Sequence, residues 1–402
     1  MNIKNKIFTK TNGIIVGLIL LSLLTRLIGV NRSIWNDEQI SLNTLSINPF
    51  LNPFYFGVTT NLPLYFYLLK IYTLNGFITN IIYIRFLGII LNTLSIYIVY
   101  KYFKFKKFKH LNLIAAYIMA ISPIQIHYAQ EIRPYALTQL LILIHLLLCL
   151  NFNKNVFSKK LYLVSGLIFL SHFAGFIYLF CINIFLVIGN IKKLSIKKIA
   201  YFISTFLIAA IIMVISYKNP NFINSYTQIS NNTKFGLSSI TEGIIKLKEV
   251  ITFYYFYGLW YYMVSPIIQE FFKKIVFSVF LSSLLIITIK KQKKLFKILT
   301  LFFIILFFSY FLDVVNLYPF GGRHIMPFSF IEYIIISVFF TYIYNLKYIV
   351  NKIIVILVLG LLLTLFSFHT YCTNNILLKT NLVGLTNSNT YQFCINKFQT
   401  PK

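Results

Sequence analysis

The sequence predicts an all-α protein that crosses a membrane many times. Of its 402 residues, 58% are hydrophobic and 11% are charged, whereas soluble proteins carry about 25% charged residues. Apolar stretches near the ~20-residue length that crosses a bilayer recur from the N-terminal region to about Phe368. We therefore predict one membrane domain over residues 1–370 and a short polar tail at 371–402.

Clusters of Lys predict the path of the chain, because short loops rich in Lys and Arg stay in the cytoplasm. Six clusters occur, at residues 4–10, 101–109, 154–160, 192–198, 290–297 and 347–352. Connecting them gives eleven spans, at residues 11–30, 81–100, 111–130, 135–151, 161–172, 173–189, 199–217, 275–289, 298–315, 325–345 and 353–370. No small-x-small cleavage site follows the first span, so we expect it to be retained and not removed as a signal peptide. Two long outer segments remain, 31–80 and 218–274, where we expect helices at the membrane surface.

The acidic residues support this path independently, because acids contribute little to the orientation rule. All of them fall on the outer side or in the outer half of a span: Asp37, Glu38, Glu131, Glu242, Glu249, Glu270, Asp313 and Glu332. The three in segment 218–274 also fit ordinary solvated charges.

The use of Arg gives a second indication of an outer site. The chain has 32 Lys but only five Arg, and all five lie near outer membrane ends: Arg26, Arg32, Arg85, Arg133 and Arg323. A guanidinium binds phosphate or carboxylate through two parallel hydrogen bonds, which an ammonium cannot do. The pattern favours an anion-binding site on the outer face.

The net charge of +29 does not indicate nucleic-acid binding, because the positive charges lie in short runs between apolar segments. Cys149 and Cys181 lie inside apolar spans, where packing explains them. Only Cys372 and Cys394 are candidates for a disulfide.

Two groups of charged residues lie early in the chain. Asp37 and Glu38 follow the first span directly, and a buried pair of adjacent carboxylates would contain a candidate general base. Equally, both acids fit the start of a helix, where they would complement the helix dipole. Glu131 and Arg133 precede Pro134 on a short outer hairpin, either as substrate contacts or as an ion pair that closes the hairpin.

Two further candidates lie at later outer turns. Two glycines precede Arg323 and His324 at the start of a span, an arrangement suited to binding phosphate, although Arg323 also fits a lipid headgroup anchor. Glu332 lies within the same span and is a natural partner for one of these cations. His172 lies at a tight turn between two short spans, where a lone His is more often structural than catalytic.

Six motifs in this order resemble the family 39-like membrane glycosyltransferases of the GT-C fold, which include protein O-mannosyltransferases and lipid A aminoarabinose transferases. The motifs are Trp35-Asn-Asp-Glu38, Asn61-Leu-Pro-Leu-Tyr65, Tyr83-Ile-Arg-Phe86, Tyr128-Ala-Gln-Glu-Ile-Arg-Pro-Tyr135, Ser171-His-Phe173 and Gly322-Arg-His-Ile-Met-Pro327. The chain departs from the pattern at Asn61 and Leu62, where relatives often carry His-Pro or Lys-Pro, so one expected cation is missing.

The resemblance implies inverting transfer of a sugar from a polyprenyl-phosphate donor, on the outer face of a bacterial plasma membrane. The acceptor is a lipid, a glycan or a protein. Asp37 is implied as the catalytic base. The implied substrate contacts are Glu38, Arg85, Glu131, Arg133, His172, Arg323 and His324. The resemblance implies no cofactor with certainty and leaves a divalent metal open.

Two other functions share some of these features. A transporter or lipid flippase would have ionisable residues near the bilayer midplane and internal repeats, whereas the charges here gather at one face. An outer-face oligosaccharide ligase or polymerase would use the same donor lipid and the same arginines, so only an assay of the joined products separates it from a glycosyltransferase.

Overall fold

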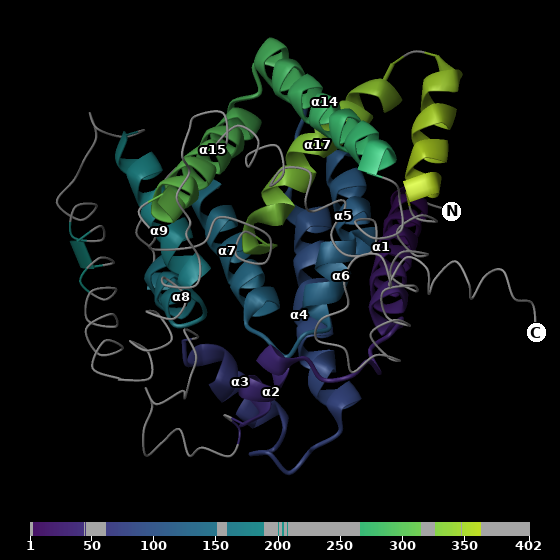
Figure 1. Cartoon of the computed structure of the whole chain (residues 1–402). Helices are drawn as coiled ribbons and strands as arrows, with labels where there is room; N and C mark the ends of the chain where they lie inside the picture. The colour runs from purple at the N-terminus through teal and green to yellow at the C-terminus, as the bar shows by residue number, and fades with distance from the viewer. Residues whose placement is uncertain are drawn as a thin grey trace, which may run out of the picture.

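A computed structural model describes residues 3–43, 45, 62–150, 159–188, 200, 203–204, 207, 266–314, 326–346 and 348–362 (Figure 1). Within these ranges the chain forms helices and no β-strand, apart from an isolated bridge between Phe105 and Phe108. The prediction of an all-α fold is therefore confirmed for the described part of the chain.

The helices follow the predicted spans closely. They are α1 (Ile3–Leu27), α2 (Asn36–Asn43), α3 (Leu64–Tyr72), α4 (Ile81–Tyr102), α5 (Leu111–Ile121), α6 (Pro123–Ala129), α7 (Tyr135–Leu150), α8 (Lys159–Phe169), α9 (Phe173–Ile188), α14 (Pro266–Lys290), α15 (Lys293–Val314), the 3₁₀ helix η3 (Met326–Phe328) and α17 (Ser329–Tyr344), with a further apolar helix at Ile349–Leu362. The span predicted at 199–217 lies almost wholly outside the described residues.

Three helices are long and apolar enough to cross a membrane by themselves: Ile81–Tyr102, Lys293–Leu312 and Met326–Tyr344. The bent pair α5 and α6 would make a fourth. The described helices thus support a membrane protein, and the count of eleven spans stays a prediction.

Three of the predicted inner loops, near residues 101–109, 290–297 and 347–352, meet at one end of the helix bundle. Lys107 Nζ donates to the Lys290 carbonyl at 2.8 Å, and Asn345 Nδ2 donates to the Lys109 carbonyl at 3.3 Å. The short helices α2 and α3 lie at the opposite end (Figure 1). Lys-rich segments that are far apart in sequence therefore share an end, as the threading of the chain predicts.

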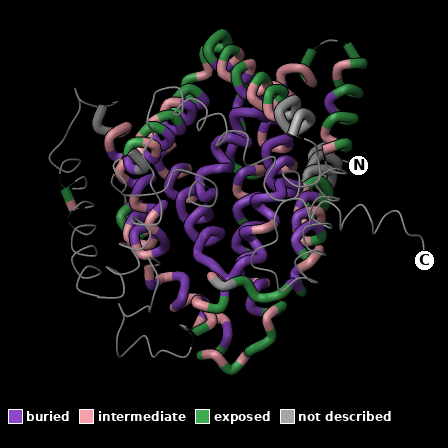
Figure 2. Tube along the Cα trace, in the orientation of Figure 1, coloured by how far each residue is buried: buried purple, intermediate pink, exposed green. Residues whose placement is uncertain are grey.

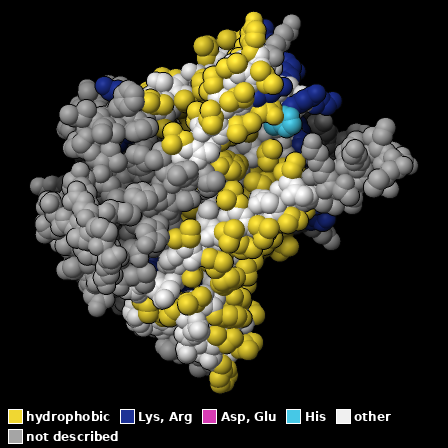
Figure 3. Space-filling model, turned by 90° about the vertical axis from the view of Figure 1, so that its right-hand side faces the viewer, with side chains coloured by type: hydrophobic (Ala, Val, Ile, Leu, Met, Phe, Trp, Pro, Cys, Tyr) yellow, Lys and Arg dark blue, Asp and Glu magenta, His cyan; other side chains and the backbone are white. Residues whose placement is uncertain are grey.

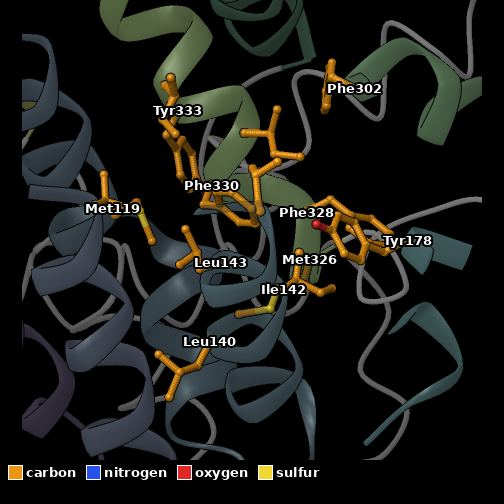
Figure 4. Close-up of a cluster of buried hydrophobic side chains, with 14 of the residues drawn as sticks. Met119, Leu140, Ile142, Leu143, Tyr178, Phe302, Met326, Phe328, Phe330 and Tyr333 are labelled. Carbon is orange, nitrogen blue, oxygen red and sulfur yellow. The ribbon is translucent and has the colours of Figure 1, made fainter. Parts of the chain in front are cut away.

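The interior is built around α4, α5, α7 and α17, which are largely buried (Figure 2). Met326 and Phe328 of η3 lie beside Ile142 of α7 and Tyr178 of α9 (Figure 4). Large apolar side chains on α1, α14 and α15 point outward, and Figure 3 shows apolar side chains over the described part of one face. Most Lys and Arg side chains visible there lie toward its upper end. Such a surface suits contact with lipid.

The span predicted at 111–130 is broken, and Arg26 stabilises the break. Pro123 has no N–H to donate to Met119, and α5 and α6 meet at a 60° bend. Arg26 donates to the freed carbonyls of Met119 at 3.1 Å and Ala120 at 2.9 Å.

The remaining donors of Arg26 bind Asn92 Oδ1, the Ser22 carbonyl and Thr25 Oγ1, and its side chain is fully buried. Arg26 is one of the five Arg near outer membrane ends, but its guanidinium is engaged by buried acceptors of the protein, so it does not contribute to the anion-binding site that the use of Arg favours.

Candidate functional site

The predicted site residues that the structure describes gather at the end of the bundle opposite the Lys-rich loops. This end is formed by α2, α3, the start of α4, the hairpin at 130–134 and the turn at 170–172 (Figure 1). The Leu64 amide at the start of α3 donates to the Leu170 carbonyl at 2.9 Å, which joins α3 to the turn between α8 and α9. The two helices in segment 31–80 agree with the helices expected in the first outer segment.

Glu38 and Arg85 form a fully buried ion pair that joins α2 to α4. Arg85 Nε and Nη2 donate to the two carboxylate oxygens of Glu38 at 3.0 and 2.7 Å. Glu38 also accepts the backbone N–H of Trp35 and of Ile132, both at 3.1 Å. The bond to Trp35 reaches back over the first turn of α2, as in a capping box.

The remaining donors of Arg85 bind the chain that follows α1. Arg85 Nη1 donates to the carbonyls of Val30 at 2.6 Å and Arg32 at 2.7 Å, and Nη2 donates to Ser33 at 3.1 Å. A guanidinium has five N–H donors, and all five are accounted for. The predicted role of Glu38 and Arg85 as direct substrate contacts does not fit this geometry. They hold α2, and with it Asp37, against the hairpin.

Asp37 differs from its neighbour Glu38 in being accessible. Both acids lie in the first turn of α2, so the alternative reading of a helix start describes their position correctly. The side chain of Asp37 is 26% exposed, and its Oδ2 lies 3.6 Å from Arg133 Nη2. Arg133 Nη1 also donates to the Asp37 carbonyl at a long 3.4 Å. Of the two adjacent carboxylates, only Asp37 can meet a substrate.

Glu131 pairs with His127 and not with Arg133. His127 Nε2 lies 2.9 Å from Glu131 Oε1, one helical turn away, and Arg32 Nη1 lies 3.1 Å from His127 Nδ1. Because a guanidinium only donates, His127 Nδ1 must accept, and the ring proton then lies on Nε2 toward Glu131. The expected ion pair across the hairpin is therefore replaced by two others, Glu131 with His127 and Arg133 with Asp37.

The pKa of Glu131 reflects these neighbours. Burial alone would raise it, but the neighbouring His127, which is hydrogen-bonded to it, and the charges of Arg32 and Arg133 outweigh burial and hold it below its ordinary value. Glu131 is therefore an ionised acceptor at neutral pH.

The buried donors at this end that lack a hydrogen-bond partner within the described residues include Nε of Arg133, whose side chain is largely buried, and the hydroxyl of Tyr65, which is fully buried. The sequence motifs predict no role for Tyr65 or His127, and Arg32 is indicated only by its place near an outer membrane end. The spacing of His127 and Glu131, four residues apart before a helix end, was an available signal.

Two glycines set how closely the helices approach this site. A Cβ added to Gly88 of α4 would lie 2.5 Å from the Ala129 carbonyl, at the base of the hairpin. A Cβ on Gly175 of α9 would lie 2.7 Å from the Ile168 carbonyl of α8. Their lack of a side chain therefore positions the hairpin with Glu131 and the turn with His172.

His172 makes the contacts expected of a structural histidine in a tight turn. It is buried in the turn before α9, and its Nδ1 accepts the Ala174 amide at 3.1 Å. Its ring packs on that of Tyr135, with centroids 5.1 Å apart. These contacts fix the start of α9 next to α7.

The last two predicted contacts, Arg323 and His324, lie outside the described residues. Glu332, their expected partner, is buried in the first turn of α17, and neither of its oxygens has a hydrogen-bond partner in the described ranges. In the same part of the chain, no group of three or more His, Cys, Asp and Glu is placed to hold a metal ion.

Comparison with known proteins does not assign the chain to a family. Searches against protein-family models and against curated proteins found no match. The case for a function therefore depends on the residues of this site and on the motifs that carry the resemblance.

Proposed function

We propose that the chain transfers a sugar from a polyprenyl-phosphate-linked donor to an acceptor hydroxyl, with inversion at the anomeric carbon. One observation carries the proposal: an accessible carboxylate, Asp37, faces a buried arginine, Arg133, that keeps a donor without a partner among the described residues. An acid that can take a proton thus lies beside a cation that can hold a leaving phosphate.

The proposed reaction is a single displacement. Asp37 takes the proton of the acceptor hydroxyl, and the acceptor oxygen attacks the anomeric carbon. The bond from that carbon to the phosphate oxygen breaks, and polyprenyl phosphate leaves with the electron pair. A glycosidase needs a second carboxylic acid to protonate its leaving alcohol. A phosphate needs only cations, so one carboxylate suffices.

The other charged residues support this pair. Glu38 and Arg85 hold α2 in place, and Arg32 with His127 holds Glu131, which is available to a sugar hydroxyl. Among the described residues the cluster contains three acids (Asp37, Glu38 and Glu131) and three arginines (Arg32, Arg85 and Arg133). A bound phosphate needs further positive charge, which we assign to Arg323 and His324.

We place this reaction on the non-cytoplasmic face of a bacterial plasma membrane, because the site lies at the end opposite the Lys-rich loops. The acceptor is a hydroxyl of an envelope lipid, glycan or protein.

Mass spectrometry of cell-envelope glycans, in cells with and without the gene, tests the proposal. We expect one sugar substituent to disappear without the gene and to return with the wild-type chain. It should not return with Asp37→Asn, which keeps the shape of Asp37 but cannot accept a proton. General base catalysis is worth about 10²–10⁴-fold in rate.

The matched control is Gln39→Ala, an exposed residue of the same helix, which should restore the sugar. Glycans that stay identical in all strains would exclude the proposed transfer. Full restoration by Asp37→Asn would exclude Asp37 as the base.

A further inference from the structure

Tyr65 presents a buried polar group that the fold itself does not use. It is the second residue of α3, its side chain is 0% exposed, and its hydroxyl has no hydrogen-bond partner in the described ranges. A buried hydroxyl without a partner destabilises a protein, whereas Phe would fill the same space without that cost. Retention of the hydroxyl therefore points to a role outside folding.

The hydroxyl lies within the electrostatic influence of the site. Burial, followed by the charge of Glu38 and then that of Glu131, raises the pKa of Tyr65 far above its ordinary value, although Arg133 opposes this. The group therefore remains a neutral O–H that can donate a hydrogen bond.

Arg133 supplies a second unused donor from a different element. Its Nε has no partner in the described part of the chain, and its contacts with Asp37 are long, at 3.4 and 3.6 Å. Arg85, a few residues into α4, has all its donors satisfied at 2.6 to 3.1 Å. The contrast identifies Arg133 and Tyr65 as two buried groups that keep a donor able to bind a ligand.

Two donors, one of them cationic, suit an anionic oxygen better than a cation or a hydrocarbon. We propose that the Tyr65 hydroxyl and Arg133 Nε bind the phosphate of the polyprenyl-phosphate donor. Tyr65 is then a substrate-binding residue. It lies on α3, the second helix of segment 31–80. This inference rests on the proposed function and names a further residue that serves it.

The test compares binding with stability for Tyr65→Phe. The full-length chain in phosphatidylcholine nanodiscs is titrated with polyprenyl phosphate and with neutral polyprenol, and its thermal unfolding is followed in parallel. We expect Tyr65→Phe to bind polyprenyl phosphate about tenfold or more weakly, because a hydrogen bond to a charged group is lost. Polyprenol binding should be unchanged, and unfolding should occur at the same or a higher temperature.

Tyr72→Phe is the matched control on the same helix. The Tyr72 hydroxyl already donates to the Tyr83 carbonyl at 3.2 Å, so its loss should leave phosphate binding unchanged. Nanodiscs that contain phosphatidylglycerol separate the lipid donor from an ordinary anionic headgroup, since only the former should depend on Tyr65.

Each other result overturns a defined part of the inference. If the wild type binds polyprenyl phosphate and Tyr65→Phe binds it equally well, the role of Tyr65 is wrong and the proposed function stands. A variant that unfolds earlier with unchanged binding would show a structural hydroxyl. If phosphatidylglycerol displaces polyprenyl phosphate in a Tyr65-dependent way, the group recognises phospholipid headgroups. A wild type that binds polyprenyl phosphate no better than polyprenol overturns both proposals.

Discussion

Replacing Arg85 and Arg133 by Lys should damage the protein in two different ways. Arg85 donates five hydrogen bonds, two to Glu38 and three to backbone carbonyls, and four of them are buried. An ammonium has three donors, so Arg85→Lys leaves at least two acceptors unsatisfied, at about 1–3 kcal/mol each. We expect a loss of at least ~2 kcal/mol of stability, with activity lost as α2 shifts.

Arg133→Lys should instead spare the fold and impair the reaction. The contacts of Arg133 with Asp37 are longer than ordinary hydrogen bonds, so their loss should cost less than ~1 kcal/mol. Removal of an electrostatic contact to a departing phosphate lowers the rate about a hundredfold or more, and Lys would restore only part of it.

Thermal unfolding in nanodiscs and release of polyprenyl phosphate from the donor measure the two effects. Lys106→Arg, in an exposed loop at the opposite end, is the control and should be silent in both assays. The reasoning would be refuted by an Arg85→Lys variant as stable as wild type, or by an Arg133→Lys variant that unfolds as early as Arg85→Lys.

Three further predictions follow from the site. Because the pKa of Glu131 is lowered in the folded protein, its ionised form stabilises the fold above pH 4.5, its ordinary pKa, and this stabilisation is lost as the pH falls through the folded pKa. Chemical denaturation should therefore show Glu131→Gln to be less stable than wild type at pH 7. The difference should vanish in acid. Gly88→Ala should displace the hairpin and abolish transfer, measured as donor turnover, whereas Gly166→Ala, where a Cβ meets nothing within 4 Å, should be tolerated. A single cysteine at Asp37, in a background without native cysteines, should react with a membrane-impermeant thiol reagent in intact cells, and one at Lys106 should not. The reverse pattern would invert the topology.

The sequence predicted the positions of the helices well because hydropathy reports how long each apolar stretch is. It also predicted that Lys-rich loops meet at one end, because the Lys and Arg content of each loop can be counted in the sequence. The break between α5 and α6 was missed, although Pro123 is visible in the sequence. A hydropathy window does not register which carbonyl loses its N–H donor, and the apolar run continues across the bend.

Several charged residues that the sequence singled out do lie together at one end of the bundle, but the pairs that they form were not predicted. Asp37 and Glu38 are adjacent and chemically similar, and only the fold shows that one is fully enclosed by Arg85 while the other is accessible. The distance of 47 residues between Glu38 and Arg85 gave no reason to pair them. His127 and Glu131 could have been paired from the sequence, because residues four positions apart are neighbours on a helix.

The few Arg residues of this chain have two different physical roles, and the structure separates them. Arg26 donates to the carbonyls at the end of α5, and Arg85 donates to carbonyls in the chain that follows α1. Both places lie where a helix stops inside or near the apolar layer, so carbonyls are left without partners and water is scarce. A guanidinium reaches several carbonyls at once from one buried position, which a Lys ammonium cannot do with its three donors. Arg at an outer membrane end is therefore not by itself a sign of a ligand. It becomes one when a buried donor has no partner, and among Arg26, Arg85 and Arg133 this holds, within the part of the chain that the structure describes, for Arg133 alone.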